Sequence, residues 1–282
     1  MIRFHTLCVA LVLVVAATTV HAEMIVNGNF EDLTGWGLPG TADTPANWTP
    51  NLDEGRKNPA LQQSGVNAIG GSGTSAFMGA DNGASGSDRR DMWQVDESNP
   101  IGPQWVVEFD FATEDPGVEG DRSLSGSVEV TNGNRITMRV TDVDDDGIGD
   151  FQIYDKSTNT TGIWRPILAN AVEFDDDVST TPVVNHITFT GHFDEAAPVY
   201  DITITNGLPG GVFTATGVGY FAYTLSTKPA TGVEGVNFNT FISKGDYLLD
   251  NVSVDVPEPG AISLLLTGFV CLAGTLVRRR HG

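Results

Sequence analysis

The sequence predicts an all-β protein, a jelly-roll β-sandwich, with a cleaved signal peptide before it and a single C-terminal transmembrane helix after it. Three observations lead to this prediction. Short runs of alternating apolar and polar residues recur between residues 23 and 255, separated by clusters of Gly, Asn, Asp and Pro. No apolar pattern of helical spacing extends over several turns in this body. Each end of the chain instead carries a continuous apolar run.

Residues 1–22 have the three parts of a secretory signal peptide. Arg3 lies in the basic start, an apolar run of about 14 residues follows, and the small residue Ala22 ends the segment. The run is too short to span a bilayer comfortably. We expect signal peptidase to cleave after Ala22, which divides the chain into the signal peptide, a β-sandwich domain over 23–255 and a C-terminal segment over 256–282.

The strands are clearest where the alternation is longest. Between residues 105 and 111 one face is apolar and the other carries Glu108 and Asp110. Similar runs occur at 24–30, 75–78, 135–143, 151–154, 186–193, 199–205, 219–225, 236–241 and 247–254. Roughly ten to thirteen strands in one domain must pack as two sheets or close into a barrel, since one open sheet would leave an apolar face in water.

The exported domain is acidic and has no cysteine. Cys8 and Cys271 both lie in the end segments, so the domain folds without a disulfide. The 282-residue chain has 15 Lys and Arg against 36 Asp and Glu, and residues 23–255 keep 11 against 35. Such a surface repels nucleic acid and attracts divalent cations, so we expect no nucleic-acid partner.

Two short segments at the ends of the domain resemble a known group. "NGNFEDLTGW" at 27–36 and "YLLDNVSVDV" at 247–256 are similar to the opening and closing strands of galactose-binding-like, carbohydrate-binding jelly rolls. In several families with that fold, a carboxylate after the first strand and an Asp in the last strand hold a structural calcium ion. The resemblance implies that Glu31 and Asp250 are such ligands, while the alternative is a solvated Glu31 and a turn-capping Asp250.

A second calcium candidate lies in "DVDDDGIGD" at residues 142–150. Positions 1, 3, 5 and 9 of an EF-hand-like loop are occupied by Asp142, Asp144, Asp146 and Asp150, with Gly at position 6. Position 12 is Ile153 rather than a bidentate acid, and the flanks alternate like strands. We therefore expect a β-hairpin whose turn contains Asp146, and a weaker calcium site than the first.

The sequence shows no motif for catalysis, so we expect the protein not to be an enzyme. It has no nucleophile elbow, no phosphate-binding loop and no zinc-protease helix. Paired acids for glycoside cleavage leave no spacing rule in a sequence, so a polysaccharide-degrading enzyme stays as an alternative. An exposed tryptophan in a jelly roll would favour glycan binding, and Trp48 in the loop-rich "PANWTPN" is the candidate.

The C-terminal segment has three parts in order. Val256, Pro257, Glu258 and Pro259 precede an apolar run predicted to form a transmembrane helix at about 260–277. The chain then carries Arg278, Arg279 and Arg280, which the positive-inside rule keeps in the cytoplasm.

This arrangement resembles the PEP-CTERM sorting signal of Gram-negative bacteria. The resemblance implies recognition by an exosortase near the Pro-Glu-Pro motif, after export across the inner membrane. It also implies a final location at the cell surface or in an exopolysaccharide matrix. We therefore expect an exported, non-catalytic protein that binds extracellular polysaccharide or contributes to a biofilm matrix, or alternatively a purely structural surface protein without a small ligand.

Overall fold

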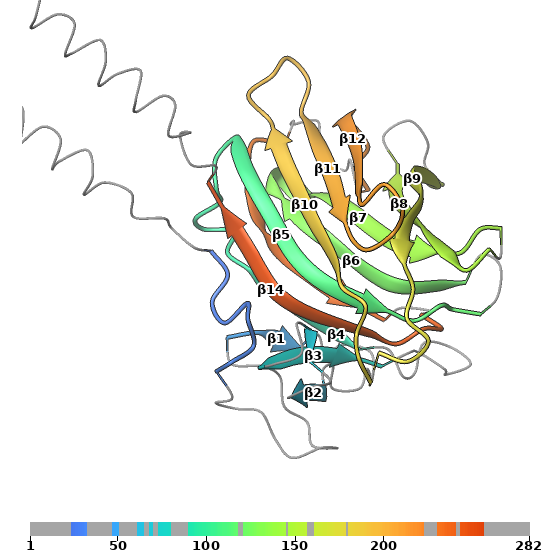
Figure 1. The fold of residues 1–282 in the computed structure, drawn as a ribbon. Coiled ribbons are helices and arrows are strands. Elements are labelled where there is room, and N and C mark those ends of the chain that lie inside the picture. The colour runs from blue at the N-terminus through green and yellow to red at the C-terminus, as the bar shows by residue number, and fades with distance from the viewer. Residues whose placement is uncertain are drawn as a thin grey trace, which may run out of the picture.

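The protein is an all-β sandwich of two seven-stranded antiparallel sheets (Figure 1). The computed structural model describes residues 24–32, 47–50, 61–64, 68–69, 73–79, 90–117, 121–144, 146–156, 161–178, 180–222, 230–240 and 243–256. Within these residues helical structure is limited to a short 3-10 turn at Thr131–Gly133 and the single 3-10 residue Ile69. The predicted all-β class is confirmed.

Each sheet combines strands from distant parts of the chain. Sheet A has the order β1 (Thr49–Pro50), β4 (Asp91–Val95), β13 (Val233–Asn239), β6 (Arg122–Val130), β7 (Asn134–Thr141), β8 (Ile148–Asp155) and β9 (Ile163–Glu173). Sheet B has the order β12 (Val212–Val218), β11 (Val199–Thr205), β10 (Asn185–His192), β5 (Gln104–Thr113), β14 (Tyr247–Asp255), β3 (Thr74–Met78) and β2 (Leu61–Ser64). Figure 1 shows β14, β5, β10 and β11 side by side.

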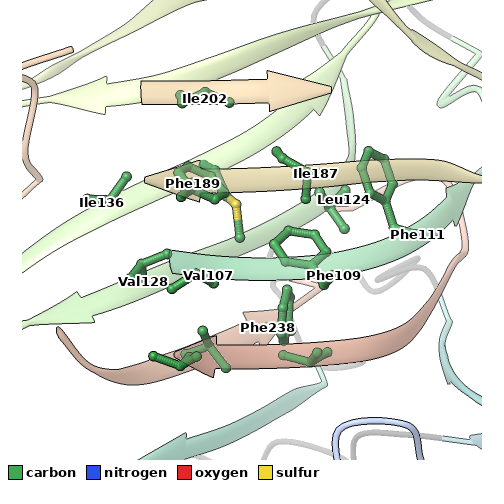
Figure 2. Packing of buried hydrophobic residues seen from close by; sticks show 14 of the residues in the cluster. Val107, Phe109, Phe111, Leu124, Val128, Ile136, Ile187, Phe189, Ile202 and Phe238 are labelled. Carbon is green, nitrogen blue, oxygen red and sulfur yellow. The ribbon is translucent and has the colours of Figure 1, made fainter. Parts of the chain in front are cut away.

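The core lies between the sheets and is rich in aromatic side chains. The alternation expected in β5 is confirmed, because Val107, Phe109 and Phe111 are fully buried while the residues between them are partly exposed. The ring of Phe238 from β13 meets that of Phe109 edge to face, with centroids 5.0 Å apart (Figure 2). Each such ring contributes about 1.5–3 kcal/mol by leaving water, so these contacts hold sheet A against sheet B.

The segment expected to be the first strand is irregular. Residues 24–30 form bends and turns rather than a strand, and Asn27 and Phe30 have positive φ. The segment still follows β14, since the N–H of Met24 donates to Val254 O and the N–H of Val252 donates to Gly28 O. A Cβ on Gly28 would lie 1.8 Å from Val252 O, so glycine permits this close approach.

The ends of the chain lie largely outside the described residues. These include the predicted signal peptide at 1–22, Pro257, Glu258 and Pro259, the predicted helix at about 260–277, and Arg278, Arg279 and Arg280. Val256 is described and is exposed. In the part of the chain that the structure describes, no helix is long and apolar enough to span a membrane.

Candidate functional site

In the structure, Glu31 and Asp250 both accept hydrogen bonds from strand β3. Glu31 Oε1 accepts a hydrogen bond of 2.9 Å from the N–H of Thr74. The neighbouring Ser75 donates its hydroxyl to Asp250 Oδ2 at 3.3 Å and accepts the N–H of Ile69 at 2.9 Å. Two carboxylates from opposite ends of the described chain therefore meet at the start of β3.

Asp250 lies in an environment that opposes its ionisation. Only 6% of the residue is exposed, and burial raises the pKa of its carboxyl to about 7. The charges of Asp110 and Glu31 contribute to this rise, while the hydrogen bonds from Asn251 N–H and Ser75 oppose it. Both donors that the described residues give to Asp250 are neutral, so a cation placed here would relieve the repulsion.

Asp110 joins this group to a histidine that sequence reasoning did not place there. Asp110 and Asp250 are register partners on β5 and β14. One carboxylate oxygen of Asp110 lies 2.7 Å from His186 Nδ1, and the other accepts the side-chain amide of Asn251 at 2.8 Å. The alternation of β5 and β10 puts Asp110 and His186 on the faces opposite the core, but only the strand register makes them neighbours.

The loop between β7 and β8 gathers three aspartates. Asp142, Asp144 and Asp146 each offer one oxygen, and these three oxygens lie within 4.8 Å of one another. Asp142 also accepts the N–H groups of Asp146 and Gly147, at 3.3 Å and 3.0 Å, so it fixes the turn. Gly147 has φ of +79°, a conformation that glycine adopts at little cost.

Asp150 lies beside this loop rather than at its centre. Its Oδ1 accepts the N–H of Asn170 at 2.9 Å. Burial raises the pKa of Asp150, and the charges of Asp144, Asp142 and Asp146 add to that effect. The flanking strands pair directly, which confirms the predicted hairpin, and the residue at position 12, Ile153, is buried in the core. The loop therefore has no bidentate acid at its twelfth position.

The expectation that Trp48 presents an exposed ring is wrong. The residue is only 5% exposed, and its ring packs against Phe30 and Phe238 with centroid distances of 5.4 Å and 6.3 Å. Its indole N–H donates to Asn27 O. The sequence around it is rich in Gly, Pro and Asn, but the apolar ring is buried because it packs against two aromatic neighbours. Trp105, expected in the core, is fully buried.

The outer face of sheet A, defined as the face turned away from sheet B, carries a partly exposed aromatic pair. Tyr154 and Trp164 are register partners on β8 and β9, and their ring centroids lie 5.1 Å apart. The core residues Phe151 and Ile153 alternate with Tyr154 along β8 and point the other way. Sequence reasoning did not single out this pair, although the period-two alternation of β8 is visible in the sequence.

Comparisons with known proteins give fold likenesses alone. No family model matches the chain, and no curated protein matches it. Among solved structures, an alginate lyase from Klebsiella pneumoniae is 7% identical and has a TM-score of 0.39, the match covering 65% of this chain and 82% of that one. The basic winged bean lectin with Tn-antigen is 10% identical with a TM-score of 0.40, covering 76% and 94%. A GH43 glycoside hydrolase is 13% identical with a TM-score of 0.47, covering 85% of this chain but 42% of its own.

These likenesses correct one prediction. The protein was expected not to be an enzyme because it has no catalytic motif, yet most of the similar structures are enzymes named for carbohydrates or their derivatives. The expectation that the protein is not an enzyme is therefore contradicted. At these identities and TM-scores no particular activity transfers to this chain.

Proposed function

We propose that the protein is exported, sorted to the cell surface or extracellular matrix, and binds polysaccharide there through its jelly-roll domain. Signal peptidase would remove residues 1–22, and an exosortase would recognise the segment beginning at Val256. Support comes from the sequence of both ends, and from the acidic charge that keeps such a domain soluble outside the cell. The host would be a bacterium of the Gram-negative type.

The observation that carries polysaccharide binding is the pair Trp164 and Tyr154. Both side chains are partly exposed on a sheet face that also carries the polar residue Gln152, two positions before Tyr154 on β8. Aromatic rings stack on the apolar C–H faces of sugars, while nearby polar groups reach the hydroxyls. The pair supports a surface that receives one or more sugar units along strands β8 and β9.

A glycan array with wild type, Trp164→Ala and Ile163→Ala tests this proposal. Ile163 precedes Trp164 on β9 and is 44% exposed, but the pleat turns it to the opposite face, which makes it a matched control. We expect wild type and Ile163→Ala to bind the same glycans and Trp164→Ala to lose them. An array without any wild-type signal would contradict the proposal and favour a structural surface protein without a small ligand.

Sorting is tested separately. The Glu258→Ala variant should accumulate in a membrane-bound form, because the change removes the acidic residue of the Pro-Glu-Pro motif. Fractionation of cells into membrane, surface and medium, with wild type beside the variant, measures this. Normal release of Glu258→Ala would contradict exosortase recognition and leave polysaccharide binding unaffected.

We further propose that calcium supports the sandwich at two places. Glu31 and Asp250 fit one ion, since they supply an exposed and a buried carboxylate hydrogen-bonded to neighbouring residues of β3, and their described donors are neutral. Asp142, Asp144 and Asp146 fit a second, weaker ion, since their oxygens converge. In both places the ion would neutralise like charges and tie together segments that are distant in the sequence or sharply turned.

A further inference from the structure

A second feature of the outer face of sheet A is a pair of arginines beside Trp164. The guanidinium carbon of Arg139 lies 4.3 Å from the centroid of the Trp164 ring, and that of Arg122 lies 5.7 Å from it. Arg139 comes from β7, Arg122 from the start of β6 and Trp164 from β9. Three strands thus bring two positive groups to one aromatic ring.

A neutral side chain holds Arg139 in place. Its Nε and one terminal nitrogen donate to Gln152 Oε1, at 2.9 Å and 2.7 Å, across the register of β7 and β8. The pKa of Arg139 is lowered to about 10, mainly by burial and to a smaller extent by the charge of Arg122. The contacts of Arg139 among the described residues are therefore with an amide, a ring and a second cation.

Other arginines of the same sheet are paired differently. Arg135 lies four residues earlier on β7, and its Nε is 2.7 Å from Glu129 Oε2. Arg165 lies next to Trp164 on β9, and its Nε is 2.6 Å from Asp155 Oδ2. The chain has more than two acidic residues for each basic one, so acidic partners are abundant. An arginine that is oriented by an amide and a ring in this setting keeps N–H donors for an anion from outside.

We propose that Arg139, with Arg122 beside it, binds the anionic group of an acidic sugar unit, whose ring contacts Trp164 and Tyr154. This inference rests on the proposed polysaccharide binding and names its ligand class. The planar guanidinium donates to two oxygens at once, which suits a carboxylate or a sulfate group. The acidic remainder of the surface repels such a polymer, so the arginine pair selects where it binds.

Binding of three polymers to the full-length protein in mild detergent tests the inference. The polymers are polygalacturonate, which carries carboxylates, dextran sulfate, which carries sulfates, and neutral dextran. Arg139→Gln removes the charge, and Arg135→Gln is the matched control because it removes the same charge from the same strand. Arg139→Lys keeps the charge but loses the planar fork, and serves if Arg139→Gln melts earlier than wild type.

We expect wild type to bind at least one acidic polymer more tightly than dextran. Arg139→Gln should weaken that binding by about 10- to 100-fold, the range for lost hydrogen bonds to a charged group. Arg139→Lys should weaken it while melting like wild type, and Arg135→Gln should bind like wild type. The acidic polymer that is bound more tightly identifies the group as a carboxylate or a sulfate.

Two other results would each overturn a different statement. Equal weakening by Arg139→Gln and Arg135→Gln, or binding of dextran as tight as that of the acidic polymers, would overturn the inference and leave polysaccharide binding standing. No wild-type binding to any of the three polymers, together with an empty glycan array, would overturn the proposed function itself.

Discussion

Glu31 and Asp250 hold neighbouring residues of one strand, although 218 positions separate them: Glu31 accepts the N–H of Thr74, and Asp250 accepts the hydroxyl of Ser75. The irregular opening segment and the last strand thus meet at the start of β3. Each carboxylate is positioned by a neutral donor, and the charge of Glu31 raises the cost of charge on Asp250. A cation bound between them would therefore affect the stability of the junction between the opening segment and the last strand.

Calcium should stabilise the protein through this junction. An ion present at 100 times its dissociation constant would add about 2.7 kcal/mol to the free energy of unfolding. We expect a chelator to lower the melting temperature of wild type. Asp250→Asn and Glu31→Gln should show a smaller dependence of the melting temperature on calcium than wild type, because only the weaker ion at Asp142, Asp144 and Asp146 would remain. Asp176→Asn, which changes an exposed acid elsewhere, is the control and should respond like wild type. A wild-type melting temperature that ignores the chelator would contradict the site.

The loop of Asp142, Asp144 and Asp146 should bind an ion independently. Asp144 is the residue to change, because Asp142 also fixes the turn through Asp146 N–H and Gly147 N–H. We expect calorimetry to give two calcium ions for wild type and one for Asp144→Asn, with the tighter ion kept. Asp250→Asn should keep the weaker ion instead. A stoichiometry that Asp144→Asn leaves unchanged would show that the three oxygens bind no calcium.

Features that depend on local pattern could be predicted from the sequence. The alternation in β5 follows from the period of two along a strand, and the β7–β8 hairpin follows from turn residues between two alternating runs. The convergence of Asp142, Asp144 and Asp146 is also local, since five residues of one loop contain all three. The pairing of Glu31 with Asp250 was predicted instead from the resemblance of the two ends of the domain to carbohydrate-binding jelly rolls.

Features that depend on strand register or on packing between distant segments could not be predicted from the sequence. Trp48 is buried because Phe30 and Phe238 lie next to it, and no local pattern relates these three positions. Arg139 meets Trp164 only because β8 lies between their strands with Tyr154 opposite Trp164 and Gln152 opposite Arg139. The predicted hairpin makes β7 and β8 neighbours, but the register that pairs Arg139 with Gln152 depends on the length of the loop between them.

Gly191 should not accept a methyl group. It is the register partner of Trp105, and a Cβ on Gly191 would lie 2.0–2.5 Å from three atoms of that indole ring. The ring is fully buried against Phe193 and cannot move aside without disturbing the core. We expect Gly191→Ala to lower the free energy of unfolding by about 1–3 kcal/mol. Gly102→Ala, whose Cβ would meet nothing within 4 Å, is the control in the same urea titrations. Equal midpoints for the two variants would contradict the close contact.

The carboxyl of Glu129 should make stability depend on pH. Burial raises its pKa above 4.5, and Glu97 adds to the effect, although Arg135 and the hydroxyl of Ser127 favour the charged form. A group whose pKa is raised by folding contributes stability that is fully present below 4.5 and is lost as the pH rises through the folded-state value. Ionisation of Glu129 therefore costs more in the folded protein than in the unfolded chain.

Glu129→Gln removes this ionisation and keeps an oxygen that can accept from Ser127. We expect the stability of Glu129→Gln relative to wild type to rise between pH 4 and pH 8, as measured by urea midpoints at each pH. Glu108→Gln on sheet B is the control, because Glu108 lies on a partly exposed position of β5 away from this group. A relative stability that falls over the same range would mean that the ion pair with Arg135 outweighs burial, so that folding lowers the pKa of Glu129 instead.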